Sequence, residues 1–313
     1  MRILITGGAG FIGSHIVEHF QKQAEIIVMD NLRSGRRSNL NGLEHRLVEA
    51  SILDRTALRE ALRGVDYVFH LAAMISVPES MTQPIECNRL NTEGTLVVLE
   101  EAARAGVKKL VFSSSAAVYG NDPTSPKSEA LLPSPESPYA VSKLDGEYYC
   151  KIFAQAGRLA SVCLRYFNVF GPRQDPASQY AAAVPIFMHR AVRHQPITIF
   201  GDGEQTRDFV YVKDVAAANA FFARNTVTTG IFNVAYGATI SINALARRIC
   251  QLTGSRSVLS HQPERIGDVK HSLAAVDRLR AAGFRPTFNL EHGLAATVAH
   301  VQAAQDAARP AAG

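Results

Sequence analysis

The sequence predicts an α/β protein built on a doubly wound parallel sheet, and three observations lead to this class. Short, continuous apolar runs recur along the first two thirds of the chain, as in strands that are buried on both faces. Stretches with the period of an amphipathic helix separate these runs. A glycine-rich turn follows the first run. Strands that alternate with helices in this way form parallel sheets covered on both faces.

Local signals bound the elements in the first part of the chain. The first strand ends at a glycine cluster, and Gly106 ends a later helix. Pro138 suits the first turn of another helix, because an amide hydrogen has no partner there. In chain order we expect strand 3–6, helix 11–21, strand 25–29, strand 66–72, helix 91–106, strand 109–115, helix 138–156 and strand 160–171.

The pattern changes at about Arg173, where the regular alternation stops. We expect a loop at 174–185, a short helix at 186–194, two short strands around a glycine turn within 197–212, a helix at 214–224, a strand within 230–237 that returns to the main sheet, and mostly helix after it. The sequence therefore predicts two domains. Residues 1–172 and 207–238 form the sheet domain, and residues 173–206 and 239–313 form a smaller, mixed α/β C-terminal domain.

Composition excludes several classes of protein. Of 313 residues, 47% are hydrophobic and 19% charged, which is typical of a globular protein. No apolar run approaches the roughly 20 residues of a membrane span. The four cysteines are scattered, which argues against a disulfide framework or a metal site and suits the cytoplasm. A net charge of +5 is compatible with an anionic small molecule and does not indicate nucleic-acid binding.

The glycine-rich turn predicts a dinucleotide site. Gly7, Gly10 and Gly13 have the spacing with which a backbone approaches a pyrophosphate at a helix N-terminus. Asp30 ends the second strand, where a carboxylate can accept both ribose hydroxyls and repel a 2′-phosphate. We therefore expect a Rossmann-type domain that binds NAD. Arg33 and Arg36 leave NADP open as an alternative.

Tyr139 and Lys143 lie four residues apart in the helix expected at 138–156. This spacing puts both side chains on one face of the helix, one turn apart. Taken alone, the pair is ordinary for a surface helix. Together with a dinucleotide site and the serine run at 113–115, it suggests a phenol held beside an ammonium for acid–base chemistry.

Several motifs occur in an order that resembles one superfamily. They are "TGGAGFIG" at 6–13, "HLAA" at 70–73, "FSSSAAVYG" at 112–120, "YAVSK" at 139–143, "RYFNVFGPRQ" at 165–174, "GDGEQTRDFVYVKDVA" at 201–216 and "RIGD" at 265–268. Together they resemble the extended short-chain dehydrogenases/reductases, and within these the nucleotide-sugar 4-epimerases that interconvert UDP-glucose and UDP-galactose. The resemblance covers nearly the whole chain.

The resemblance implies catalytic roles for Ser115, Tyr139 and Lys143. Tyr139 and Ser115 take the proton of the C4 hydroxyl while NAD accepts the hydride; the 4-keto sugar then turns over, and the hydride returns to the other face. Lys143 bonds the nicotinamide ribose and, with the nicotinamide cation, lowers the pKa of Tyr139 toward neutrality. Ser113 and Ser114 are less suited to the chemistry, because alternate side chains of a strand point to different faces. We expect His70 to pack at a strand end.

The resemblance also implies a set of NAD-binding residues. Ser51 stands where many relatives carry an aspartate near the adenine amine, so a weak adenine contact is expected there. The full set is Gly7, Gly10, Phe11, Ile12, Gly13, Asp30, Asn31, Ser34, Gly35, Ser51, Ile52, Leu71, Ala72, Ala73, Asn91, Ser113, Tyr139, Lys143 and Tyr166.

The substrate residues that the resemblance implies lie mainly in the later motifs. Arginines suit this work, since their planar fork binds phosphate oxygens bidentately. A small residue at Ser272, where some relatives carry a bulky tyrosine, implies a sugar pocket wide enough for an N-acetyl group. The expected UDP-sugar contacts are Ser76, Ser115, Tyr139, Asn168, Arg207, Arg265, Asp268 and Ser272.

Other functions remain open beside a UDP-glucose/UDP-galactose 4-epimerase that also accepts UDP-GlcNAc and UDP-GalNAc. One is a UDP-uronic acid 4-epimerase or decarboxylase, another is a simple NADP reductase, and a third is a non-enzymatic NAD-binding regulator. Ala116 and Ala117 replace the acid pair of the related dehydratases, which argues against dehydration. The resemblance also implies a homodimer that packs two helices per subunit, near 92–105 and 139–156.

Overall fold

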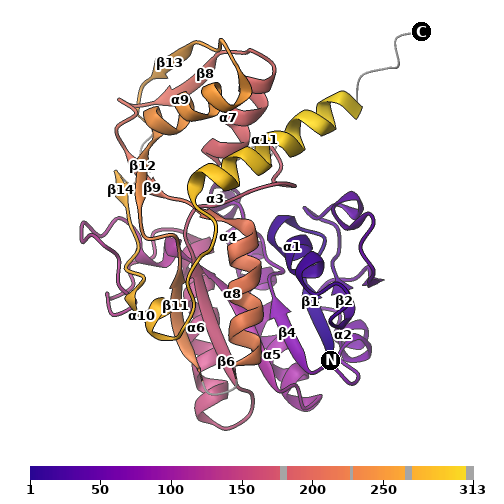
Figure 1. The fold of residues 1–313 in the computed structure, drawn as a ribbon. Coiled ribbons are helices and arrows are strands. Elements are labelled where there is room, and N and C mark those ends of the chain that lie inside the picture. Colours follow the sequence, from indigo (N-terminus) through magenta and orange to yellow (C-terminus); the bar gives the residue numbers. More distant parts are fainter. Residues whose placement is uncertain (177–181, 226–227, 265–269, 308–313) are drawn as a thin grey trace.

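The computed structural model describes residues 1–176, 182–225, 228–264 and 270–307 (Figure 1). Its main element is a seven-stranded sheet in which every neighbouring pair is parallel. The strand order β3-β2-β1-β4-β5-β6-β11 reverses direction at β1, as in a Rossmann fold. The strands are β1 (Arg2–Thr6), β2 (Glu25–Met29), β3 (Arg46–Val48), β4 (Tyr67–His70), β5 (Lys109–Ser115), β6 (Ser161–Tyr166) and β11 (Gly230–Val234). The predicted fold class is confirmed.

Helices cover both faces of this sheet. Alternate residues of β1 point to opposite sides, so Ile3 and Ile5 belong to one core and Leu4 to another. The first core lies under α1 (Phe11–His19) and α8 (Val212–Arg224), which pack against each other. The second lies under α2 (Arg55–Ala61), α5 (Gly94–Arg104) and α6 (Pro138–Gln155). Figure 1 shows α8 running along the sheet.

Short helices and turns shape the segments between the strands. The helix predicted at 91–106 has a wide π turn, η2 (Arg89–Glu93), before α5 begins. Ser137 caps α6, its hydroxyl accepting a hydrogen bond from the Ala140 amide at 3.2 Å, and Pro138 occupies the first turn as expected. The remaining short elements are η1 (Arg37–Leu40), α3 (Val77–Thr82), α4 (Pro84–Asn88) and η3 (Ala116–Tyr119).

The C-terminal part forms a separate core above the carboxyl ends of the strands (Figure 1). Its apolar centre includes Val184, Met188, Ile199, Leu245 and Leu294. Its elements are α7 (Ala183–Val192), β8 (Ile197–Phe200), β9 (Thr206–Asp208), β10 (Val210–Tyr211), β12 (Thr239–Ser241), α9 (Ile242–Thr253), β13 (Leu259–Gln262), β14 (His271–Ser272) and α11 (Leu290–Ala307). The short helix α10 (Asp277–Ala281) packs instead beside β11 of the main sheet.

Two strand predictions need correction. The strand predicted at 160–171 is β6 followed by a separate strand, β7 (Val169–Phe170), which leaves the main sheet and pairs with β10. The two strands predicted within 197–212 are three, and each belongs to a different small sheet: β8 with β13, β9 between β12 and β14, and β10 with β7. The reason is that these short strands pair with distant segments, which local patterns do not reveal.

The predicted domain boundaries stay a prediction. Strand β11 pairs with β6, which confirms that residues 230–234 return to the main sheet. Leu279 and Phe284, which fall in the segment expected for the smaller domain, pack in the core beneath α8. Strand β9, which falls in the segment expected for the sheet domain, pairs instead with β12 and β14.

Candidate active site

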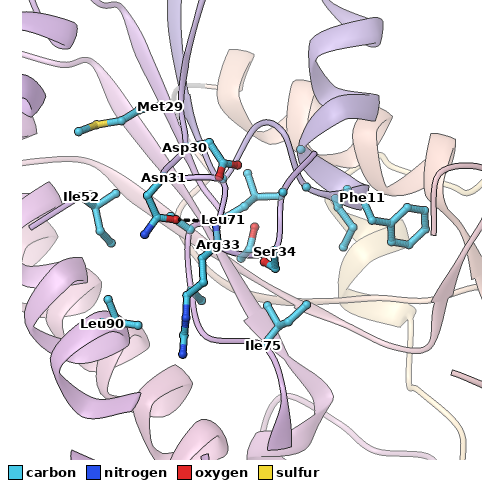
Figure 2. Close-up of a pocket in the computed structure, with 18 of the residues that line it drawn as sticks. Phe11, Met29, Asp30, Asn31, Arg33, Ser34, Ile52, Leu71, Ile75 and Leu90 are labelled. Atoms are coloured by element: carbon cyan, nitrogen blue, oxygen red, sulfur yellow. Dashed lines mark hydrogen bonds between the residues drawn. The ribbon is translucent and has the colours of Figure 1, made fainter. Parts of the chain in front are cut away.

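A cavity opens at the carboxyl ends of β1, β2, β4 and β5, where the strand order reverses (Figure 2). This is the position at which open parallel sheets bind ligands. The structure brings together here the predicted residues Gly7, Gly10, Phe11, Ile12, Gly13, Asp30, Asn31, Ser34, Gly35, Ser51, Ile52, Leu71, Ala72, Ala73, Ser113, Tyr139, Lys143 and Tyr166. Met29, Arg33, Ala50, Ile75, Leu90 and Ser114 also line it. Most of these six residues lie outside the sequence motifs, so the sequence did not indicate that they line the cavity.

The glycine turn is as tight as its spacing predicts. Gly7 has a φ of +71°, which favours glycine. A Cβ atom on Gly13 would lie 2.3 Å from the Gly7 carbonyl oxygen, so any larger residue must displace the turn. Helix α1 begins at Phe11, so the unpaired amide groups of its first turn lie at the cavity. This geometry fits a pyrophosphate.

Asp30 lies buried between the turn and the following loop. Its carboxylate accepts hydrogen bonds from the Ala9 amide at 3.0 Å and the Leu32 amide at 2.8 Å. Burial raises the pKa of Asp30, and the two amide hydrogen bonds oppose that rise. The carboxylate therefore holds the loop in place and still faces the cavity, where ribose hydroxyls can donate to it.

Lys143 is buried against β5, and Tyr139, one helical turn before it, is half-buried. The Lys143 ammonium donates to the Ser113 carbonyl at 2.9 Å, and its Nζ lies 5.8 Å from the centre of the Tyr139 ring. Burial lowers the pKa of Lys143 to about 8. A hydrogen bond links Tyr139 to Ser115, whose hydroxyl also accepts from the Ala117 amide at 3.1 Å. The predicted Ser115, Tyr139 and Lys143 are thus one cluster.

The protein by itself raises the pKa of Tyr139. The lowering toward neutrality that the resemblance implies depends on the nicotinamide cation as well as on Lys143, and it stays a prediction for the protein with bound cofactor. Burial, which disfavours the charged phenolate, is the largest effect and outweighs the hydrogen bond from Ser115. Any lowering must therefore come from charge that the cofactor brings.

The serine run divides between two faces, as strand alternation predicts. The Ser113 hydroxyl lies 3.0 Å from the Tyr166 hydroxyl, which in turn lies 2.8 Å from the Asn219 amide nitrogen on α8. The Ser114 hydroxyl instead donates to Glu147 on α6, which forms a buried, bidentate ion pair with Arg165. These contacts hold α6 and α8 on the two sides of the sheet that ends at the cavity.

Asn91 and His70 both hold neighbouring segments in place. Asn91 does not line the cavity, and its side chain bonds both backbone groups of Met74 and the Ser142 hydroxyl, so its cofactor role stays a prediction. It therefore positions the loop after β4. His70 is buried as expected and bonds the hydroxyls of Thr6 and Thr95 at 2.7 and 3.0 Å. Burial lowers the pKa of His70 to about 3, so it stays neutral.

The structure also places most of the predicted substrate residues. Arg207 and Ser272 face each other as neighbours on β9 and β14, although they are distant in sequence. The Asn168 amide donates to the Asp208 carbonyl at 2.9 Å, beside the same strand. Ser76 caps α3, accepting from the Glu79 amide at 3.1 Å. Arg265 and Asp268 lie outside the described residues.

The residues around the cavity fit NAD: a glycine cradle without space for side chains, a carboxylate for ribose hydroxyls and a lysine among polar groups. Among the described residues, no cluster of histidine, cysteine or carboxylate side chains could hold a metal ion. The same part of the chain contains no helix that is both long and apolar enough to cross a membrane. Within it, all four cysteines are free.

Comparison with known proteins agrees with this site. Residues 3–235 match the model of the NAD dependent epimerase/dehydratase family. The solved UDP-N-acetylglucosamine 4-epimerase of Methanobrevibacter ruminantium is 40% identical, with a TM-score of 0.93 over 97% of this chain and 98% of that one. The UDP-glucose 4-epimerase of Mycolicibacterium smegmatis is 37% identical over 95% of this chain and 97% of its own.

A third relative has a different activity. It is the UDP-N-acetyl-α-D-glucosaminuronate decarboxylase of Bacillus cytotoxicus, which is 34% identical over 95% of this chain and 96% of its own. Each of the three relatives aligns with this protein over almost its entire length. The chain therefore belongs to the NAD-dependent epimerase/dehydratase family and is an NAD-dependent enzyme of the epimerase type.

Proposed function

We propose that this enzyme is a UDP-sugar 4-epimerase acting on UDP-glucose and UDP-galactose, and also on UDP-GlcNAc and UDP-GalNAc. The observation that carries the proposal is the cluster of Ser115, Tyr139 and Lys143 beside the cofactor cavity. Relatives with 4-epimerase names support it. The UDP part of the substrate would be bound by Asn168, Arg207, Arg265 and Asp268, and the sugar by Ser76 and Ser272.

The chain's own residues would move the proton of the C4 hydroxyl. Bound NAD supplies the reversible hydride acceptor. Tyr139 takes the proton through Ser115, which already bonds it, and returns it after the sugar has turned over. Lys143, held by the Ser113 carbonyl, presents a donor to the ribose beside the phenol. No net oxidation follows, so the cofactor is regenerated in each turnover.

The test is an NMR spectrum of the purified protein incubated separately with UDP-glucose, UDP-GlcNAc and UDP-glucuronic acid. We expect the C4 epimer to appear from the first two without added NAD. Loss of the carboxyl group from the third would favour the decarboxylase, the second candidate that the Bacillus cytotoxicus relative supports. The absence of any product, even with added NAD, would contradict the epimerase.

Sugar selection is tested at Ser272. We expect Ser272→Tyr to slow UDP-GlcNAc turnover more than UDP-glucose turnover, because a bulky ring beside Arg207 narrows the space for an N-acetyl group. The measurement is the ratio of kcat/KM for the two sugars, with Ser272→Ala as the control that keeps the space open. An unchanged ratio in the tyrosine variant would refute this role.

We propose further that the enzyme is a homodimer in the cytoplasm. Val141, Tyr148 and Ile152 form an exposed apolar stripe along α6, and Met81 and Ile85 lie exposed on the neighbouring α3 and α4. Exposed apolar stripes of this kind are typical of helix–helix interfaces. On α5, by contrast, Glu100 and Glu101 pair with Arg55. The free cysteines suit a reducing compartment.

A further inference from the structure

An ion pair crosses the rim of the cofactor cavity. Arg33 belongs to the loop after β2, and its guanidinium donates to the Glu79 carboxylate on α3 at 2.9 Å. Arg33 and Ser34, from the loop after β2, line the cavity, and so does Ile75, which lies in the segment just before α3. Figure 2 shows the Arg33 side chain extending from its loop between Ile75 and Leu90.

Both ends of this bridge are fixed to the catalytic framework. The Arg36 amide donates to the Ala9 carbonyl at 2.9 Å, which ties the loop to the glycine turn. On the other side, Ser80, next to Glu79, accepts a hydrogen bond from the Tyr139 amide at 3.2 Å. The ion pair therefore connects the segment that binds the dinucleotide with the helix that carries the catalytic phenol.

We infer that the Arg33–Glu79 pair is a latch that retains NAD between turnovers. An epimerase returns its cofactor to the starting state, so exchange with solvent brings no benefit, whereas loss of the cofactor stops catalysis. A bridge across the rim slows escape of the dinucleotide without contacting the reacting atoms. The inference rests on NAD being the cofactor and, from the proposed function, on its regeneration in each turnover; it does not depend on which sugar is the substrate.

The expected effect is modest because the pair is partly solvated. The Arg33 and Glu79 side chains are 38% and 34% exposed. Breaking an exposed ion pair of this kind should accelerate NAD release by about 2- to 5-fold. Salt screens partly exposed charges, so the unaltered protein should release NAD faster as salt rises.

The decisive variant is Glu79→Gln, because it breaks the pair and leaves the Arg33 cation beside the cavity. Protein loaded with radiolabelled NAD is mixed with excess unlabelled NAD, and loss of bound label is followed over time at low and high salt. Arg33→Gln and the double variant Arg33→Gln/Glu79→Gln complete a double-mutant cycle, which measures the coupling between the two side chains. The matched control is Glu60→Gln, which breaks the exposed Arg46–Glu60 pair outside the cavity lining.

If the latch exists, Glu79→Gln and Arg33→Gln each release NAD faster than the unaltered protein. The double variant should release NAD at nearly the same rate as either single variant. Salt should change the release rate of the variants less than that of the unaltered protein. Glu60→Gln should behave as the unaltered protein does. If Arg33 acts only as a cation toward the dinucleotide, Glu79→Gln releases NAD at the original rate or more slowly, which overturns the inference. Because release is measured without substrate, failure of the epimerase proposal would appear separately.

Discussion

Burial shifts the two central side chains of the site in the same sense, toward their neutral forms. The pKa of Lys143 falls to about 8, and the pKa of Tyr139 rises. Without further charge, little phenolate exists at neutral pH. We therefore expect Tyr139, the proposed base, to be activated by positive charge that the cofactor brings.

The ionisation of Tyr139 should therefore respond to NAD. Phenolate absorbance, taken as the difference between the unaltered protein and Tyr139→Phe, isolates this group from the other tyrosines. In protein freed of dinucleotide we expect the transition above the ordinary tyrosine pKa of about 10. Binding of NAD should move it to lower pH, because a nearby cation favours the anion. A transition unmoved by NAD would show that the phenolate is not stabilised in this way.

Replacement of the phenol tests its chemical role. Tyr139→Phe removes the proton acceptor but keeps the ring, so the rate of epimer formation should fall by about 10²- to 10⁴-fold. The amount of NAD that stays bound to the protein after purification should change little. Tyr148→Phe is the matched control, since Tyr148 lies exposed on the same helix. If Tyr139→Phe is as active as Tyr148→Phe, Tyr139 is not the proton acceptor.

At the scale of elements, the β1–α1 turn lines the cavity in which we expect NAD to bind. The turn closes by backbone hydrogen bonds, with the Gly10 amide donating to the Gly7 carbonyl at 3.1 Å. The same carbonyl approaches Gly13, so the first turn of α1 packs directly on the preceding loop. The dinucleotide site is therefore a consequence of close backbone packing.

Alanine substitutions at the glycines of this turn should lower the melting temperature by different amounts. On Gly13 a Cβ would lie 2.3 Å from the Gly7 carbonyl oxygen, while on Gly10 the same contact is 3.1 Å and φ is −75°. We expect Gly13→Ala to lose bound NAD and to lower the melting temperature, and Gly10→Ala to have the smaller effect on melting. Calorimetry and cofactor content measure both. A larger loss of melting temperature in Gly10→Ala would contradict this account of the turn.

At the scale of the whole molecule, the main sheet and the C-terminal part contribute different residues to the proposed site. The sheet and its helices hold the dinucleotide cavity, and the C-terminal core brings β9 and β14 with Arg207 and Ser272. The outer surface of α6, which carries Tyr139 and Lys143 inward, presents Val141, Tyr148 and Ile152 outward. The helix that supports catalysis is therefore also the expected dimer contact.

A charge on this stripe should separate the subunits. Ile152→Glu places a carboxylate in the proposed interface, where its desolvation is costly. We expect the mass measured by light scattering to fall from two chains to one. Val258→Glu is the control, because Val258 is equally apolar and exposed but lies outside α6. A dimer that survives Ile152→Glu would place the interface elsewhere.

Patterns in the sequence were enough to predict the fold class, most strands of the main sheet, the glycine turn with Asp30 and the grouping of Ser115, Tyr139 and Lys143. These follow from short-range causes: hydrophobic period, capping, glycine spacing and the four-residue separation of Tyr139 and Lys143. The tertiary structure alone decided the pairing of β7 with β10, the structural role of Asn91 and the Arg33–Glu79 bridge. Each depends on segments distant in sequence, and only the packing of the whole chain brings them together.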